Sequence, residues 1–104
     1  MSNWVDVKLQ TEFLENTREI VDLDYTTVIV FNINNHYYAI DHLCTHADFG
    51  LEDADCEDGI VTCPYHGAKF CVKSGKALCA PAFEDIEIYN VRIQDGMVQV
   101  QAPE

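Results

Sequence analysis

Residues 26–40, TTVIVFNINNHYYAI, decide how this chain folds. The segments from Thr26 to Asn32 and from Tyr37 to Ile40 are rich in β-branched and aromatic side chains, which is typical of strands. Between them lie Asn34 and Asn35, which tolerate the positive φ of a tight two-residue turn. This stretch therefore predicts a β-hairpin.

The same signal recurs toward the C-terminus. Three further turn dipeptides separate strand-like segments, namely Asp58-Gly59, Ser74-Gly75 and Asp95-Gly96. The strands expected around them are Ile60 to Cys63, Lys69 to Val72, Tyr89 to Ile93 and Met97 to Gln101. Short strands with frequent turns predict an all-β fold, a small antiparallel sandwich or barrel.

Two segments depart from the strand pattern. Thr11 to Glu15 predicts a short helix, with Thr11 as its cap. The only long segment without strand character runs from His42 to Glu57, and it is polar and rich in acidic residues. A loop of this length inside a compact domain is usually functional.

Composition limits the classes of function. The chain has 104 residues, 48% of them apolar, and 6 basic against 18 acidic residues give a formal charge of -12, which is typical of one small globular domain. So few cations argue against binding nucleic acid or anionic membranes. No apolar run approaches the roughly 20 residues of a membrane-spanning helix, and the opening MSNWVDVKLQ lacks a signal-peptide profile. We expect a cytoplasmic monomer whose five cysteines stay reduced.

Two short boxes carry the chemistry. They are Cys44-Thr45-His46 and Cys63-Pro64-Tyr65-His66-Gly67. Each box supplies one thiolate and one imidazole from a tight turn, so the two boxes together make a Cys2His2 ligand set. Ligand type alone leaves both an iron-sulfur centre and a zinc-binding module open, although the chain has no Cys-x-x-Cys knuckle of the zinc-ribbon kind.

The paired boxes at this separation resemble the Rieske 2Fe-2S signature. From Trp4 to Val100, the turn positions and strand spacing also resemble the small Rieske ferredoxins of bacterial ring-hydroxylating dioxygenases. The resemblance implies one 2Fe-2S cluster, with its iron ligands at Cys44 and Cys63 on one iron and at His46 and His66 on the other. It further implies a single Rieske domain with a β base, about residues 1–41 and 83–104, and an inserted cluster-binding subdomain, about residues 42–82.

The resemblance also implies what the protein does. It predicts an electron carrier, not an enzyme, that takes one electron from an NAD(P)H-dependent flavoprotein reductase to a terminal oxygenase. Two neutral imidazoles in place of thiolates make one iron easier to reduce, so Rieske potentials run from about -150 to +300 mV against about -400 mV for plant-type clusters. A sensing or regulatory role, or one in iron-sulfur metabolism, is the alternative for the same cluster.

Departures from the high-potential pattern indicate where in this range the protein falls. Respiratory Rieske proteins resemble these boxes but carry an extra Cys in each, and a hydroxyl residue after the His-Gly pair. Here the corresponding residues are Phe49, Tyr65 and Ala68. Without the disulfide and the hydroxyl hydrogen bond, we predict a potential at the low end of the range.

Two surface features predict docking. Apolar residues near the cluster either exclude water from it or form a collar that docks on partners; those of the collar are Phe49, Pro64, Tyr65 and Pro81. Most of residues 52–58, EDADCED, are acidic. They form either a solvated loop or a surface that steers association with basic partners.

Three cysteines lie outside the boxes. Cys71 and Cys79 lie in strand-like segments, where we expect them to pack as small buried hydrophobes. Cys56 lies in the acidic run, whose carboxylates disfavour a thiolate, so we expect neither a nucleophile nor a ligand there.

Overall fold

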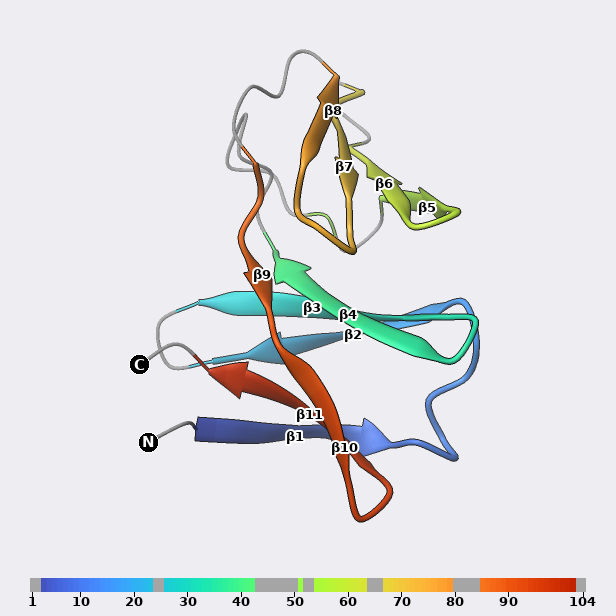
Figure 1. Ribbon diagram of the computed structural model, residues 1–104, viewed down its shortest axis with the longest axis vertical. Helices are drawn as coiled ribbons and strands as arrows, with labels where there is room; N and C mark the ends of the chain where they lie inside the picture. The colour runs from blue at the N-terminus through green and yellow to red at the C-terminus, as the bar shows by residue number, and fades with distance from the viewer. Residues whose placement is uncertain are drawn as a thin grey trace.

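The computed structural model describes residues 3–23, 26–42, 51, 54–63, 67–79 and 85–102. In this part of the chain all regular structure is β, in three sheets whose neighbouring strands are antiparallel. Figure 1 shows the sheets arranged along the long axis of the molecule, with the sheet of β3 between the other two. The predicted all-β fold class is confirmed.

Each sheet has a simple strand order. The first sheet consists of β1 (Asn3–Leu9), β11 (Met97–Ala102) and β10 (Val91–Gln94), in that order. The second sheet consists of β2 (Thr17–Asp22), β3 (Thr27–Ile33), β4 (His36–Asp41) and β9 (Ile88–Tyr89). The third sheet consists of β5 (Asp55–Glu57), β6 (Ile60–Thr62), β7 (Lys69–Cys71) and β8 (Ala77–Cys79). We call the first two sheets the base.

The hairpin predicted at residues 26–40 is the β3–β4 pair. Ile33 pairs directly with His36, so its loop has the two residues Asn34 and Asn35, with φ of 53° and 65°. Positive φ at both central residues matches the right-handed twist of the flanking strands. The asparagines therefore set the register of the hairpin.

Strand β3 is buried on both faces. Val28 and Val30 pack with residues of the first sheet, while Ile29 and Phe31 pack with residues of the third sheet. Burying one such side chain contributes about 1.5 to 3 kcal/mol relative to leaving it exposed. Strand β3 thus contributes to both apolar clusters, as β4 does through Ala39 and Ile40.

The helix expected at Thr11 to Glu15 is wrong, because the structure has a turn there. The N–H groups of Glu12 and Phe13 both donate to the carbonyl of Leu9, at 2.9 and 3.0 Å. One turn fixes several dihedral angles for very few hydrogen bonds, so it does not grow into a helix without further support. Instead Phe13, which is 3% exposed, anchors the turn by packing edge-on against Tyr37.

Other boundaries also differ from the sequence-based expectations. The strand expected from Tyr89 to Ile93 is interrupted at Asn90, so that β9 belongs to the second sheet and β10 to the first. The end of the expected loop from His42 to Glu57 forms β5. Strands β1, β2 and β8 were not predicted. Among the residues that the structure describes, no helix is long and apolar enough to cross a membrane.

Candidate metal centre

The second Cys/His box begins at Cys63, directly after β6. Its N–H donates to the carbonyl of Ala68 at 2.7 Å, and its carbonyl accepts the N–H of Gly67 at 2.9 Å. Gly67 has a φ of 72°, a left-handed conformation that favours glycine and lets the chain turn back toward β7. These two hydrogen bonds fix the backbone on either side of residues 64–66, which include His66.

The first box lies in the sequence between two described residues, His42 and Leu51, that are hydrogen-bonded to each other. The N–H of Leu51 donates to the carbonyl of His42 at 2.8 Å, and the N–H of Ala54 donates to the carbonyl of Leu51 at 3.1 Å. Leu51 is fully buried. Residues 43–50, which include Cys44 and His46, therefore connect two hydrogen-bonded residues.

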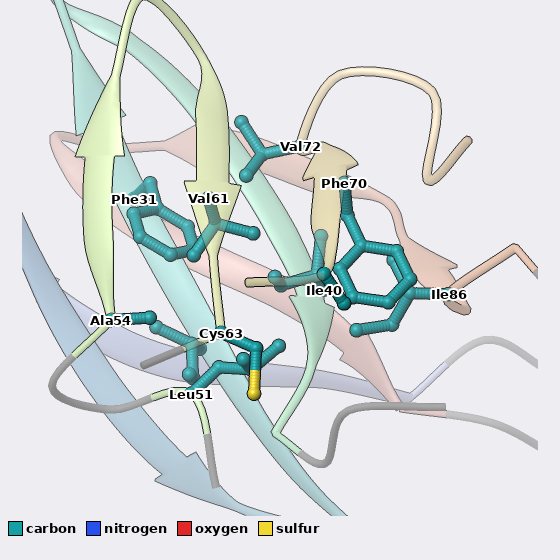
Figure 2. Packing of buried hydrophobic residues seen from close by; sticks show 11 residues of the cluster. Phe31, Ile40, Leu51, Ala54, Val61, Cys63, Phe70, Val72 and Ile86 are labelled. Atoms are coloured by element: carbon teal, nitrogen blue, oxygen red, sulfur yellow. The ribbon is translucent and has the colours of Figure 1, made fainter. Parts of the chain in front are cut away.

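The ends of the two stretches meet in one apolar cluster. Leu51 and Cys63 both belong to the cluster beneath the third sheet, and Figure 2 shows them together at one end of it. Cys63 is 1% exposed and its thiol is free of any disulfide. A buried thiol among aliphatic side chains suits a metal ligand that is shielded from water, because the apolar surroundings of a site control solvent access and potential.

The structure places one of the four predicted ligands. Cys63 is buried directly after β6, while the other three lie outside the described residues, namely Cys44, His46 and His66. The predicted docking residues also lie outside them, namely Phe49, Pro64, Tyr65 and Pro81. Within the described part of the chain, no group of three or more His, Cys, Asp or Glu side chains is placed to hold a metal ion.

Ala68 lies opposite Cys63 in the hairpin loop and is fully buried. Its methyl group has no hydrogen-bond donor, so the side chain at this position contributes only apolar packing to the site. The donor set that the sequence supplies, two thiols and two imidazoles, is the set that a Rieske 2Fe-2S cluster requires. The described residues therefore fit such a cluster.

The cysteines outside the boxes differ from one another in their environments. Cys56 lies in β5 rather than in a loop, and burial raises the pKa of its thiol, although the nearby charge of Arg18 lowers it. It is thus a neutral thiol as expected, chiefly because of desolvation. Cys71 is only half-buried, contrary to expectation, and a hydrogen bond from the Ser74 hydroxyl lowers the pKa of its thiol. The side chain of Cys79 is outside the described set.

The described acids of the 52–58 run lie on the outer face of the third sheet. Asp55 and Glu57 are exposed on either side of the inward-facing Cys56, and together with Asp58 and Lys69 they line a shallow groove. The run is therefore in part a strand. Its charged edge is accessible to solvent, as both the solvated and the steering interpretations require.

One contact near the site could not be recognised in the sequence. The guanidinium of Arg18, on β2, donates from Nη1 to the carbonyl of Leu51 at 3.1 Å. The partner is a backbone oxygen 33 positions away, which leaves no mark in the sequence. The scarcity of cations, six in the whole chain, is the only signal that singles such a residue out.

The all-β fold, the two Cys/His boxes of the sequence and the buried thiol of Cys63 are typical of a small metal-binding β-domain. The chain belongs to the family of the Rieske [2Fe-2S] domain, whose model matches residues 3–90. This membership confirms the family and the cofactor that the boxes suggested, and it decides between the iron-sulfur centre and zinc in favour of the former.

Individual relatives are ferredoxins. The chain is 38% identical over 88 residues to the 3-phenylpropionate/cinnamic acid dioxygenase ferredoxin subunit of Shigella flexneri serotype 5b (strain 8401), covering 83% of each chain. Among solved structures, the carbazole 1,9a-dioxygenase ferredoxin of Nocardioides aromaticivorans IC177 superposes with a TM-score of 0.89 at 25% identity, over 99% of this chain and 100% of that one. The Sphingomonas yanoikuyae B1 ferredoxin gives 0.87 at 27% identity, over 97% and 100%.

Proposed function

We propose that this protein is the ferredoxin of a ring-hydroxylating dioxygenase system and that it delivers electrons, one at a time, to a terminal oxygenase. The observation that carries this proposal is the match to a dioxygenase ferredoxin subunit over 83% of both chains. In this role the protein is an electron carrier and not itself the catalyst. The electron donor we propose is an NAD(P)H-dependent flavoprotein reductase.

The proposed ligands are Cys44 and Cys63 for one iron and His46 and His66 for the other. The bound 2Fe-2S cluster supplies reversible one-electron chemistry in the range of about -150 to +300 mV. The described residues support this site in two ways: hydrogen bonds hold the backbone of Cys63, and the apolar cluster covers the inner side of its thiol. Ala68 offers no hydroxyl donor, which supports a potential at the low end of the range.

We further propose a transient encounter with the partners. Asp55 and Glu57 are exposed on β5, and a chain of net charge -12 is attracted to basic docking surfaces. The apolar collar of Phe49, Pro64, Tyr65 and Pro81 supplies the contact itself in this proposal. A small, charged interface suits fast association and fast release, as electron transfer requires. A cytoplasmic monomer is the form in which we propose that the protein acts.

Visible absorption and low-temperature EPR of the protein purified without oxygen test the proposal. Before and after reduction with dithionite, with iron and zinc quantified, we expect two irons per chain and the low average g value of mixed Cys/His ligation. Reduction by a flavoprotein reductase and NADH should then be slowed by added salt if the acidic surface steers association. A colourless protein with one zinc per chain would contradict the proposal.

A further inference from the structure

Arg18 connects the base to the chain that carries the metal ligands. It lies on β2, at the edge of the second sheet, opposite Phe31 on β3. Its guanidinium carbon lies 4.9 Å from the centroid of the Phe31 ring, while Nη1 donates to the carbonyl of Leu51 at 3.1 Å. One side chain therefore stacks on a base residue and bonds a residue next to the proposed site.

The hydrogen-bonded residue, Leu51, is the first described residue after residues 43–50, which contain the first box. The N–H of Leu51 donates to the carbonyl of His42, which precedes residues 43–50. The carbonyl of Leu51 also accepts the N–H of Ala54 at 3.1 Å. The bond from Arg18 is charge-assisted, and such bonds are roughly twice as strong as neutral ones. Any displacement of Leu51 therefore has to break or distort a bond to Arg18.

Arg18 borders a small cavity, which Phe31 and Cys56 also line, between the base and the third sheet. Truncation of Arg18 enlarges this cavity and removes the donor to the carbonyl of Leu51. A lysine keeps the charge, but it lacks the planar fork that lies flat on an aromatic ring while it donates in its own plane.

We propose that Arg18 is a positioning residue of the metal centre: it fixes Leu51, and with it the end of the stretch that carries Cys44 and His46. This inference rests on the proposed ligand set. It assigns the placement of the first box to a residue of the base, outside both boxes.

Three variants of the cluster-loaded protein test it. Arg18→Gln removes both the charge and the planar guanidinium group, and Arg18→Lys removes only the planar guanidinium group. The matched control is Arg92→Gln, because Arg92 stacks on Trp4 at 4.2 Å and bonds Gln99 at 2.8 Å on the first sheet. The control loses the same charge and the same kind of stacking without touching Leu51.

The readouts are iron loss to a chelator, the EPR line shape of the reduced protein, and amide hydrogen exchange in the peptide that contains Leu51. We expect both Arg18 variants to lose iron at least about tenfold faster, the scale of one hydrogen bond to a charged group. Their EPR signal should broaden and exchange at Leu51 should accelerate. Arg92→Gln should match the parent protein in all three.

Each contrary result overturns the inference in a recognisable way. If Arg18→Lys behaves like the parent, charge rather than positioning is at work. If Arg92→Gln shows the same losses, the effect is general destabilisation; if neither Arg18 variant differs from the parent, Leu51 is held without it. If the parent protein itself lacks the Rieske EPR signal, the proposed function is overturned, and the inference about Arg18 with it.

Discussion

The base and the third sheet differ in how much of their stability their own strands supply. In the base, β2 and β3 pair over six residues, and so do β3 and β4. In the third sheet every strand has three residues, and β7 and β8 pair at only two positions. So short a sheet depends on the apolar cluster beneath it and, in the metal-loaded protein that we propose, on the ligand bonds. Strand pairing therefore contributes more to the stability of the base than to that of the third sheet.

The sharpest way to break this comparison is to remove the one proposed ligand that the structure describes, Cys63. Cys63→Ala takes away a thiolate, so we expect complete loss of the cluster absorption and EPR signal, with the third sheet destabilised and the base intact. Iron content, visible spectra and far-UV circular dichroism check this. Cys71→Ala is the matched control, because Cys71 lies on β7 of the third sheet and outside the boxes, and it should keep the spectrum. An unchanged cluster in Cys63→Ala would show that the ligand assignment is wrong.

Two buried phenylalanines probe the two regions separately. Phe70 is fully buried under the third sheet, and Phe13 is 3% exposed in the base. Replacing either by alanine should cost about 3 to 5 kcal/mol of local stability. On heating, Phe70→Ala should lose the visible absorption early while the base keeps its circular dichroism, whereas Phe13→Ala should melt the base early. Coincident transitions in both variants would mean that the molecule is a single cooperative unit.

Two glycines give a smaller contrast. Gly75 and Gly96 have φ of 76° and 77°, but a Cβ on Gly75 would lie 2.2 Å from the carbonyl oxygen of Ile86, while one on Gly96 meets no atom within 4 Å. Gly96→Ala should cost about 1 kcal/mol through left-handed strain alone. Gly75→Ala should cost about 2 to 4 kcal/mol, because backbone atoms must also move. Urea unfolding measures both, and equal losses would contradict this account.

The smallest effect compares the two faces of the third sheet. The pKa of Cys71 is lowered by the Ser74 hydroxyl, and the pKa of Cys56 is raised by burial. As the pH rises, Cys71 should therefore become a thiolate at a lower pH than Cys56. Iodoacetamide labelling followed by peptide mass spectrometry should resolve the two pH profiles. Ser74→Ala should move the Cys71 profile upward; coincident profiles in the parent would refute the assignment.

Local sequence signals located the parts of the fold that local chemistry determines. Asn34 and Asn35 can adopt positive φ next to each other, which made the central hairpin recognisable. Asn90 carried no comparable signal, although β9 and β10 on either side of it join different sheets. Which sheet a strand joins depends on distant partners, and periodicity along the chain does not contain that information.

The same distinction applies to the candidate site. The two boxes could be recognised because residue type and spacing are local, and the match to the Rieske family supports the cofactor they predict, while the four ligand positions stay a prediction. The bond from Arg18 to Leu51 could not be predicted, because it ends on a carbonyl group that every residue possesses. Contacts to the backbone become visible only when the fold is known.

The burial of β3 on both faces determines how evenly the chain tolerates substitution. A strand covered on one face accepts polar residues at alternate positions, as β11 does with Gln99 between Val98 and Val100. In β3 all residues from Val28 to Asn32 are buried, and the one polar side chain among them, Asn32, donates its amide N–H to the carbonyl of Phe13 and accepts the N–H of Asn35. A saturation scan should therefore show an unbroken intolerant block in β3 and a period of two in β11. We therefore expect substitutions to be tolerated better in the outer strands and turns than in β3.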